Sequence, residues 1–434
     1  MKTCQTELLM AASLRQGYGL QSTTCMTCTT CTTCTTCTTC TTCMTCTIAR
    51  LFYYFYPMSS RLHKTRVAFS VTNCICHDQR VLKIADTVSK SGCDITIIGR
   101  RSGDCCDSDS VPFKTRRFRM IFKKGFLFYK FFNIRLLFYL LFNRYDILVA
   151  DDLDTLLPNF IAARLKRIPL VYDSHEYFTG VAEIQDRTFV KWVWKTIEKM
   201  IFPRLKYIMT VSDSIAVKYE NEYGIRPVTV RNCSNSSTAI NGYSREEMHV
   251  KSEHLLLVLQ GTGINEDRGG EELIEAIRIT ENVSLLVIGS GDVLPVLREK
   301  VKSSGISDRV IFIPKLPWVE LMRYTRSADA GLSLDKDTNL NNHFSLPNKL
   351  FDYISAGIPV ISGNLPEPGK IIHEYGCGLI IRQINAGEIA SVFKNLLGNR
   401  ELLNELKRNT RKASEYLNWK NESERVRDFY KQII

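Results

Sequence analysis

From Arg66 onward, short apolar runs alternate with longer stretches whose apolar residues recur at helical spacing. An apolar run of about four to eight residues between turn residues predicts a buried strand, and apolar residues three and four apart predict a helix packed on one face. Strands that alternate with helices predict a parallel sheet with right-handed crossovers. The first strands are expected at 66–71, 94–99, 147–150, 168–173, 207–211 and 228–231, and helices at 79–91 and 155–165.

A second series of the same kind follows residues 231–252, which are rich in Asn, Ser and charge and are typical of a linker. Two doubly wound α/β domains are therefore predicted, and ligands are expected at the carboxyl ends of both sets of strands. The second strands are expected at 255–259, 284–288, 310–313, 330–334, 358–362 and 378–381. The helices are expected at 271–277, 294–303, 318–327, 348–356 and 386–397, with polar helices from 401 to the end.

The first 57 residues follow a different pattern. Nine of the 16 cysteines lie there, and eight of them recur at every third position from Cys25 to Cys46. Cysteines at this spacing can bind zinc, but the segment has no histidine and almost no charge. A translated nucleotide repeat ahead of a start such as Met58 fits the strict period better. We therefore expect residues 1–57 to form a low-complexity leader without a fold of its own.

Charge is concentrated in one segment of the chain. The formal net charge is +12, and residues 113–145 hold nine Lys and Arg and no acid, among many large aromatic side chains. Three interpretations stay open: a helix at an anionic membrane surface, an ordinary crossover helix, or a nucleic-acid surface. The apolar excess favours the membrane and argues against nucleic acid. Because no uncharged apolar run reaches the ~18 residues of a spanning helix, we expect no transmembrane segment.

Two short motifs are weak on their own. Asp152-Leu153-Asp154 offers the paired carboxylates with which some sugar transferases hold a divalent ion on a diphosphate. The alternative, which we favour, is that Asp154 caps the helix that follows, so no metal site is expected. The turn that contains Gly289 and Gly291 opens a helix after a strand, but tight connections use glycines for other reasons too.

Three longer stretches together are similar to glycosyltransferase family 4, whose members are metal-independent retaining enzymes of the GT-B fold. The similarity extends from about Arg66 to the end of the chain, and the segments His77–Leu82 and Asp152–Leu156 resemble the bacterial branch that builds surface polysaccharides. The three stretches are Val171–Phe178, Gly261–Ala276 and Ser345–Ile361.

The resemblance implies a fold and a division into domains. GT-B proteins have two facing, doubly wound Rossmann-like domains and a C-terminal helix that crosses back. On this basis we expect an N-terminal acceptor domain at 58–235, a nucleotide-sugar domain at 236–415 and the returning helix at 416–434.

The resemblance also assigns donor-side residues. Without a metal, cations and helix N-termini have to stabilise the diphosphate leaving group. Arg268 matches the family's diphosphate cation, and Lys349 is a second phosphate ligand. Asp352 matches the carboxylate that accepts hydrogen bonds from the ribose hydroxyls. The other donor-side residues are Gly289, Gly291, Ser345 and Asn348. The alternative for Arg268 is a solvated loop residue.

Near the transferred sugar, the resemblance points to His175 with Glu176 beside it, and these two residues and Arg268 form the expected catalytic set. The alternative for His175 is a core histidine at the end of a strand. On the acceptor side the matching residues are His77, Asp78 and Arg80.

The chain departs from the family pattern in several places. Phe344 replaces the first glutamate of the Glu–x7–Glu pattern, and Asp352 replaces the second. Thr262 lies where many members have an arginine, and Asp151 lies where a histidine is frequent. These changes suggest a different sugar contact and leave one diphosphate cation missing.

Taken together, these features predict a retaining enzyme that moves a sugar from a UDP- or GDP-sugar to a saccharide acceptor, which we expect to be lipid-linked, in surface-polysaccharide synthesis. The expected location is the cytoplasmic face of the cell membrane, and no cofactor is expected. Two rivals remain: a catalytically silent homologue that acts as a membrane-associated assembly partner, and a nucleotide-sugar epimerase of the same fold.

Overall fold

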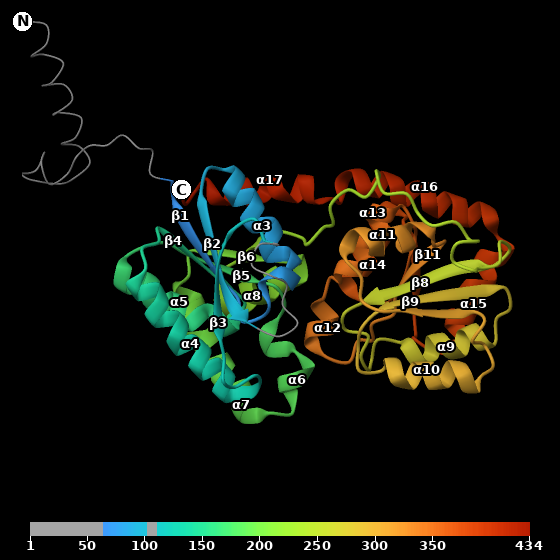
Figure 1. The fold of residues 1–434 in the computed structure, drawn as a ribbon, viewed down its shortest axis with the longest axis horizontal. Coiled ribbons are helices and arrows are strands. Elements are labelled where there is room, and N and C mark those ends of the chain that lie inside the picture. Colours follow the sequence, from blue (N-terminus) through green and yellow to red (C-terminus); the bar gives the residue numbers. More distant parts are fainter. Residues whose placement is uncertain (1–63, 102–110) are drawn as a thin grey trace, which may run out of the picture. The chain divides into compact units, whose positions relative to one another are not determined.

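The computed structural model describes residues 64–101 and 111–434, so the predicted leader and the predicted start at Met58 lie outside the described residues. The described chain forms two parallel sheets, each covered by helices (Figure 1). The predicted linker corresponds to the connection between the sheets, which consists of turns and extended chain. Most predicted strands and helices are observed within two residues of the expected bounds.

The first sheet has the strand order β3-β2-β1-β4-β5-β6-β7, in which the order reverses beside β1. Each pair is parallel; Val67, for example, lies between Ile95 and Ile147. The strands are β1 (Arg66–Ser70), β2 (Asp94–Arg101), β3 (Lys114–Arg119), β4 (Ile147–Asp151), β5 (Leu170–Ser174), β6 (Tyr207–Thr210) and β7 (Val228–Thr229).

Helices cover this sheet on both faces. On one face, the aromatic side chains of Phe132, Tyr172, Phe202 and Tyr219 are fully buried in a single apolar core. The helices are α3 (Gln79–Lys90), α4 (Gly125–Phe142), α5 (Leu153–Lys166), α6 (Ala182–Gln185), α7 (Thr188–Ile201) and α8 (Asp213–Tyr223). Short 3-10 turns are η1 (Ile75–His77), η3 (Phe178–Gly180) and η4 (Phe202–Arg204).

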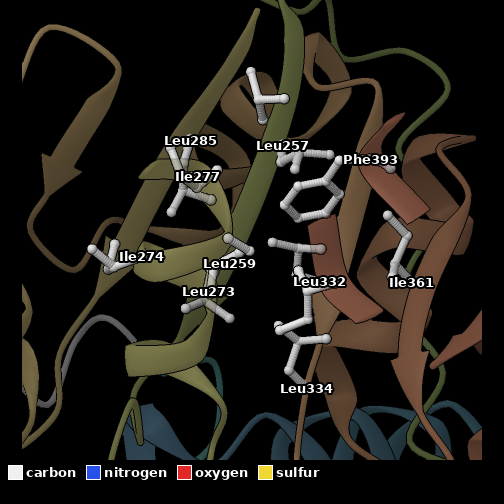
Figure 2. Packing of buried hydrophobic residues seen from close by; sticks show 14 of the residues in the cluster. Leu257, Leu259, Leu273, Ile274, Ile277, Leu285, Leu332, Leu334, Ile361 and Phe393 are labelled. Carbon is white, nitrogen blue, oxygen red and sulfur yellow. The ribbon is translucent and has the colours of Figure 1, made fainter. Parts of the chain in front are cut away.

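The second sheet has the order β10-β9-β8-β11-β12-β13 and is also parallel throughout. Leucines of its central strands meet Ile277 and Phe393 from the covering helices in one close-packed core (Figure 2). The strands are β8 (Leu255–Gly261), β9 (Val283–Gly289), β10 (Val310–Ile313), β11 (Ala330–Ser333), β12 (Val360–Gly363) and β13 (Gly378–Ile381). The helices are α9 (Gly270–Arg278), α10 (Leu294–Ser303), α11 (Trp318–Ser327), α12 (Leu340–Phe344), α13 (Asn348–Ala356), α14 (Pro366–Tyr375), α15 (Ala386–Gly398) and α16 (Arg400–Tyr416).

The last helix, α17 (Trp419–Tyr430), returns to the first sheet. Val426, Phe429 and Tyr430 are buried in the same core as α3 and β1, and the ammonium of Lys83 on α3 lies 5.5 Å from the ring centroid of Trp419. This return helix and the two doubly wound sheets confirm the predicted GT-B fold.

The basic aromatic segment differs from its prediction as one helix. Its first part is the edge strand β3, which carries Lys114, Arg116, Arg117 and Arg119 and buries only Phe118. Edge strands tolerate such charge because one side of the strand is unpaired. The second part is α4, which has large apolar side chains on both its buried and its exposed sides and only two charged residues, Lys130 and Arg135. By length and composition α4 meets the criterion for a membrane-crossing helix, which the sequence had not led us to expect, although 22% of it is buried against the rest of the protein.

Candidate active site

Two loops meet at the carboxyl ends of β8 and β9, where Gly261 lies opposite Gly289. A Cβ added to Gly289, whose φ is 135°, would lie 1.8 Å from the carbonyl oxygen of Gly261. One added to Gly291 would lie 2.1 Å from that of Ile264. Only glycine permits this close approach. The observed role of Gly289 and Gly291 is therefore to let the two loops pack together, and this packing supports the loop that carries Arg268.

The predicted diphosphate cations come together on one carboxylate. Arg268 approaches from the loop before α9, and its Nη1 donates to Asp335 Oδ1 over 2.7 Å. Lys349, in the first turn of α13, places its Nζ 3.1 Å from Asp335 Oδ2. Asp335 follows β11 and is fully buried, whereas both cations remain partly exposed. Residues 81 positions apart in the sequence thus form one cluster at the carboxyl edge of the second sheet.

This donor-side cluster has one positive charge in excess. Burial alone would raise the pKa of Asp335, but Lys349 and Arg268 hold it below its usual range, so the carboxyl is ionised. Two partly exposed cations beside one buried anion leave a site that favours a second anion. Asp335 was not among the predicted residues. Its signal in the sequence was an acidic residue directly after a buried strand.

The remaining donor-side residues already have partners within the protein. The Ser345 hydroxyl donates to the carbonyl of Asn342, and the Asn348 carbonyl accepts from the Asn232 amide. Asp352 accepts three hydrogen bonds, which are Ser234 Oγ to Oδ1 (2.6 Å), Trp318 Nε1 to Oδ1 (3.1 Å) and Gln260 Nε2 to Oδ2 (3.0 Å). Because a carboxylate has about four acceptor positions, a ribose could use the remaining one or displace a protein donor.

His175 follows β5 and lies among three carboxyl groups. Its Nε2 is 3.3 Å from Asp173 Oδ2 and 3.6 Å from Asp151 Oδ1, and its Nδ1 is 3.4 Å from Asp152 Oδ2. The backbone N–H of His175 also donates to Asp152 Oδ1 over 2.7 Å. The side chain is largely buried but retains 17% of its exposure. It is therefore an accessible group at the carboxyl edge of the first sheet, held in place by Asp151, Asp152 and Asp173.

The electrostatics of this acceptor-side cluster make His175 a cation. Burial would lower the pKa of His175, but Asp152, Asp151 and Asp173 raise it well above its usual value. Burial raises the pKa of Asp151 to about 7, against the influence of His175. Burial also works to raise the pKa of Asp173, but Arg80 and His175 hold it well below its usual range. We conclude that an imidazolium and ionised Asp173 coexist here.

The Asp-Leu-Asp motif contributes differently from the prediction. The helix α5 begins at Leu153, so its N-cap is Asp152 and Asp154 lies inside the first turn. Asp152 has a φ of 62°, a conformation that is strained for a residue with a side chain, and its carboxylate orients His175. Asp154 accepts from the hydroxyl of Thr72, and burial raises its pKa to about 7. The sequence had assigned the cap to Asp154.

One group of ligand atoms in the described chain has metal-site geometry. Oxygens of Asp151 and Asp173 and a ring nitrogen of His175 lie within 4.8 Å of one another. Arg80 already gives one hydrogen bond to each carboxylate oxygen of Asp173. An ion here would have to displace the proton of His175 and compete with Arg80 for both oxygens of Asp173, which disfavours a bound metal.

Of the predicted acceptor-side residues, Arg80 has to be corrected. Only 2% of it is exposed, and its guanidinium donates to Asp173 (2.9 and 2.6 Å) and to the carbonyl of Val230 (2.7 Å). These hydrogen bonds occupy N–H groups of the guanidinium within the fold. Arg80 therefore positions Asp173 and does not face a saccharide acceptor. Asp78 caps α3 by accepting from the N–H of Val81. The side chain of His77 lies outside the described part of the chain.

Helix α12 links the second sheet to the active-site residues of the first. Asn341 Nδ2 donates to Glu176 Oε2 over 2.9 Å, and Asn341 Oδ1 accepts from the N–H of Tyr177 over 3.2 Å. Phe344 packs edge-on against the ring of Tyr177. At the position of the family's glutamate, the chain therefore has an aromatic contact between the two halves. The sequence analysis missed Asn341, because a five-residue helix has too few residues for a periodic signal.

The outer side of α4 exposes a continuous apolar stripe, formed by Leu127, Phe131, Ile134, Phe138 and Phe142. The opposite side, with Phe128, Phe132, Leu136 and Leu140, is buried in the core. Exposed Lys130 and Arg135 flank the stripe on either side. Monomeric soluble proteins rarely expose so many large apolar side chains in one row.

Two family models match neighbouring parts of the chain: Glycosyltransferase Family 4 at residues 78–234 and Glycosyl transferases group 1 at residues 247–413. A curated relative, the chitobiosyldiphosphodolichol beta-mannosyltransferase of Debaryomyces hansenii, is 26% identical over 184 residues. That match covers 38% of this chain and 38% of the relative, so it spans well under half of the relative's length.

Solved structures extend the similarity to the whole fold. Sucrose-phosphate synthase from Thermosynechococcus elongatus has a TM-score of 0.69 at 15% identity and covers 85% of this chain and 99% of its own. HepE from Anabaena, solved in complex with UDP and glucose, has a TM-score of 0.68 at 13% identity and covers 85% of this chain and 100% of its own. At such identities the likeness concerns the fold alone. Because the two family models together span well over half of the sequence, the chain belongs to glycosyltransferase family 4 and has the GT-B fold.

Proposed function

We propose that the protein is a retaining glycosyltransferase that moves a sugar from a UDP- or GDP-sugar to a lipid-linked saccharide during surface-polysaccharide synthesis. The observation that carries this proposal is the pairing of Arg268 and Lys349 on Asp335 at the carboxyl edge of the second sheet. Two similarities support the ligand classes. HepE was solved with UDP and glucose, and the Debaryomyces relative is named for a saccharide on diphosphodolichol.

Arg268 and Lys349 would bind the diphosphate of the donor and stabilise the charge that develops on it as the sugar leaves. Preorganised cations act strongly here because they need no reorganisation during the reaction. Asp335 keeps the two cations together before the donor arrives. In this proposal the cations replace the divalent ion that other sugar transferases use, and no metal or other cofactor takes part.

His175 would lie beside the transferred sugar as an imidazolium, with Glu176 next to it. The three carboxyl groups around His175 keep the ring charged and fixed, so it serves as a hydrogen-bond donor to the sugar and not as a base. Asp78 and His77 remain candidates for the acceptor side. Asp352 would accept from the ribose, in competition with Ser234, Trp318 and Gln260.

The proposed location is the cytoplasmic face of an anionic membrane. The apolar stripe of α4 would enter the headgroup region, and Lys130, Arg135, Lys123 and Lys124 would face anionic lipid. A lipid-linked acceptor would then be presented at the same surface.

The experiment is a transfer assay with a panel of nucleotide sugars and a lipid-linked acceptor extract, in excess chelator, with the product read by mass spectrometry and its anomeric configuration by NMR. We expect transfer to persist and the donor configuration to be kept. Loss of transfer in chelator, together with the same loss in Asp152→Ala or Asp154→Ala, would replace this mechanism by a metal-dependent one.

A second candidate is a catalytically silent homologue that acts as a membrane-associated assembly partner. Phe344 in place of a carboxylate and the three protein donors on Asp352 favour it. UDP or GDP binding without transfer to any acceptor of the panel would select this candidate.

A further inference from the structure

A cavity of about 540 Å³ opens at the amino ends of β5 and β6, at the opposite end of those strands from His175. Four of the side chains that line it are basic, and among its described lining residues there is no Asp or Glu. Arg164 and Arg167 belong to the end of α5, and Arg204 and Lys206 to the connection between η4 and β6. Two chain segments, about 40 residues apart in the sequence, thus contribute cations to one hollow.

The ordinary structural explanation is that these cations balance the negative ends of nearby helices. It accounts for Arg204, which donates to the carbonyl of Met200 at the end of α7. It also accounts for Arg164 in the last turn of α5 and for Arg167 at its C-cap, but it does not explain why four cations line one hollow, and within 64–101 and 111–434 none of the four forms an ion pair with a carboxylate. Arg167 also has a φ of 56° at the C-cap of α5, a position that glycine occupies more favourably.

Exposed apolar side chains lie at the ends of the helices around this cavity. Leu165 is adjacent to Arg164, and the backbone carbonyl of Met200 accepts a hydrogen bond from Arg204. The side chains of Leu165 and Met200 are both at least 47% exposed. Phe142, the last residue of the α4 stripe, is 82% exposed. The ammonium of Lys166 donates to the carbonyl of Asn143 and so joins the end of α4 to the end of α5. One hydrogen bond thus connects the Phe142 end of the stripe to the end of α5, where Arg164 and Arg167 lie.

We propose that this cavity binds the phosphate of an anionic lipid headgroup while the α4 stripe enters the bilayer surface. The guanidinium of arginine can donate two parallel hydrogen bonds to the oxygens of a phosphate. The neighbouring apolar side chains favour a phosphate that carries acyl chains over a free phosphate. The inference rests on the membrane association in the proposed function and deepens it, by naming a headgroup site apart from the donor and acceptor sites. Because the cavity lies at the strand ends opposite His175, a lipid held there leaves the active site open.

The test compares vesicle binding of the full chain on two surfaces of equal charge density, measured by co-sedimentation. One surface is phosphatidylcholine with phosphatidylglycerol, and the other is phosphatidylcholine with oleate, whose charge is a carboxylate. The pocket variant carries Arg164→Gln, Arg167→Gln, Arg204→Gln and Lys206→Gln. The control variant makes the same charge change at exposed positions of the second half of the chain, Lys302→Gln, Lys394→Gln, Arg408→Gln and Lys412→Gln.

We expect the unmodified protein to prefer phosphatidylglycerol vesicles by roughly tenfold, the pocket variant to lose this preference, and the control variant to keep it. Equal binding to both surfaces, or a preference that survives in the pocket variant, would overturn the proposal. If glycerol phosphate in solution saturates the protein and phosphatidylglycerol vesicles do not compete with it, the site serves a free phosphate and the lipid assignment is wrong.

Two further measurements keep the result interpretable. Arg167→Gly relaxes the backbone at the C-cap of α5, so this variant should keep the fold. It should still weaken the preference for phosphatidylglycerol vesicles, and it therefore tests the site even if the pocket variant unfolds. Calorimetry with UDP and GDP reads the proposed function separately. The pocket variant should bind them as the unmodified protein does, so that a failed headgroup site and a failed donor site give different results.

Discussion

The two clusters of the candidate active site, proposed for the donor and for the acceptor, hold buried charge in opposite ways. On the donor side, one buried carboxylate, Asp335, holds two partly exposed cations, Arg268 and Lys349. On the acceptor side, several buried carboxyl groups surround His175, and Arg80 is sealed inside the fold. The first cluster has positive charge to spare, and the second has carboxyl groups in excess.

This difference predicts the orientation in which the donor binds. A diphosphate is attracted by Arg268 and Lys349, so the proposed donor should bind with its diphosphate at this cluster and its sugar toward His175. The carboxyl groups of the acceptor-side cluster keep His175 protonated. Each cluster therefore needs an unbalanced charge that would be costly in an ordinary core, and the following substitutions test whether those charges are used as described.

The largest effect is expected for His175→Gln, measured as the free energy of unfolding in urea at several pH values. Removing one partner of a buried charge cluster costs about 3–5 kcal/mol. The folded-state pKa of His175 is raised above 6.5, so its contribution is fully present below pH 6.5 and is lost as pH rises through the folded value. The penalty of the substitution should therefore be greatest near pH 6 and shrink in alkaline solution.

His254→Gln is the matched control, because burial lowers the pKa of His254. Its contribution is present above pH 6.5 and is lost as pH falls through the folded value, so its penalty should follow the opposite trend. If both variants show the same pH dependence, the carboxyl groups do not keep His175 charged.

Arg268→Ala should have the next largest effect, on turnover and not on stability. It removes a contact to the diphosphate that strengthens as the bond breaks, which costs about 3–4 kcal/mol of transition-state stabilisation, or roughly 10²–10³-fold in kcat. We expect kcat to fall more than KM rises. Arg278→Ala, on the exposed side of α9 and paired with Glu275, is the control and should leave both constants unchanged. Equal effects of the two substitutions would remove Arg268 from the active site.

Asp352→Asn should have the smallest effect of the three. It weakens a ribose contact present in both ground and transition states, so about 1.5 kcal/mol, roughly tenfold, should appear in KM for the nucleotide sugar. Ser234→Ala frees one acceptor position on Asp352 without changing its charge. If Asp352 binds the ribose, Ser234→Ala should lower KM or leave it unchanged; if Asp352 only secures the fold, both variants should lower the melting temperature and leave KM alone.

The sequence was informative where its signals were periodic and less so where they were not. The buried strands and amphipathic helices have clear patterns, and Arg268 and Lys349, which the resemblance assigned to the diphosphate, both pair with Asp335. The strand β3 was missed because its charges conceal the alternation that buries Phe118, and α12 was missed because it is short. Arg80 was assigned to the acceptor side through the resemblance of residues 77–82. Only the three-dimensional structure shows that its side chain turns inward to Asp173 and Val230.

The most direct test of the central claim is a calorimetric titration of UDP and GDP in excess chelator. The claim is that Arg268 and Lys349, joined by Asp335, bind the donor diphosphate without a metal. We predict that one of the two nucleotides binds the unmodified protein in chelator and that Lys349→Gln weakens this binding at least about tenfold, as expected for the loss of a charge-assisted hydrogen bond. Binding that requires a divalent ion, or that is unchanged in Lys349→Gln, would contradict the account.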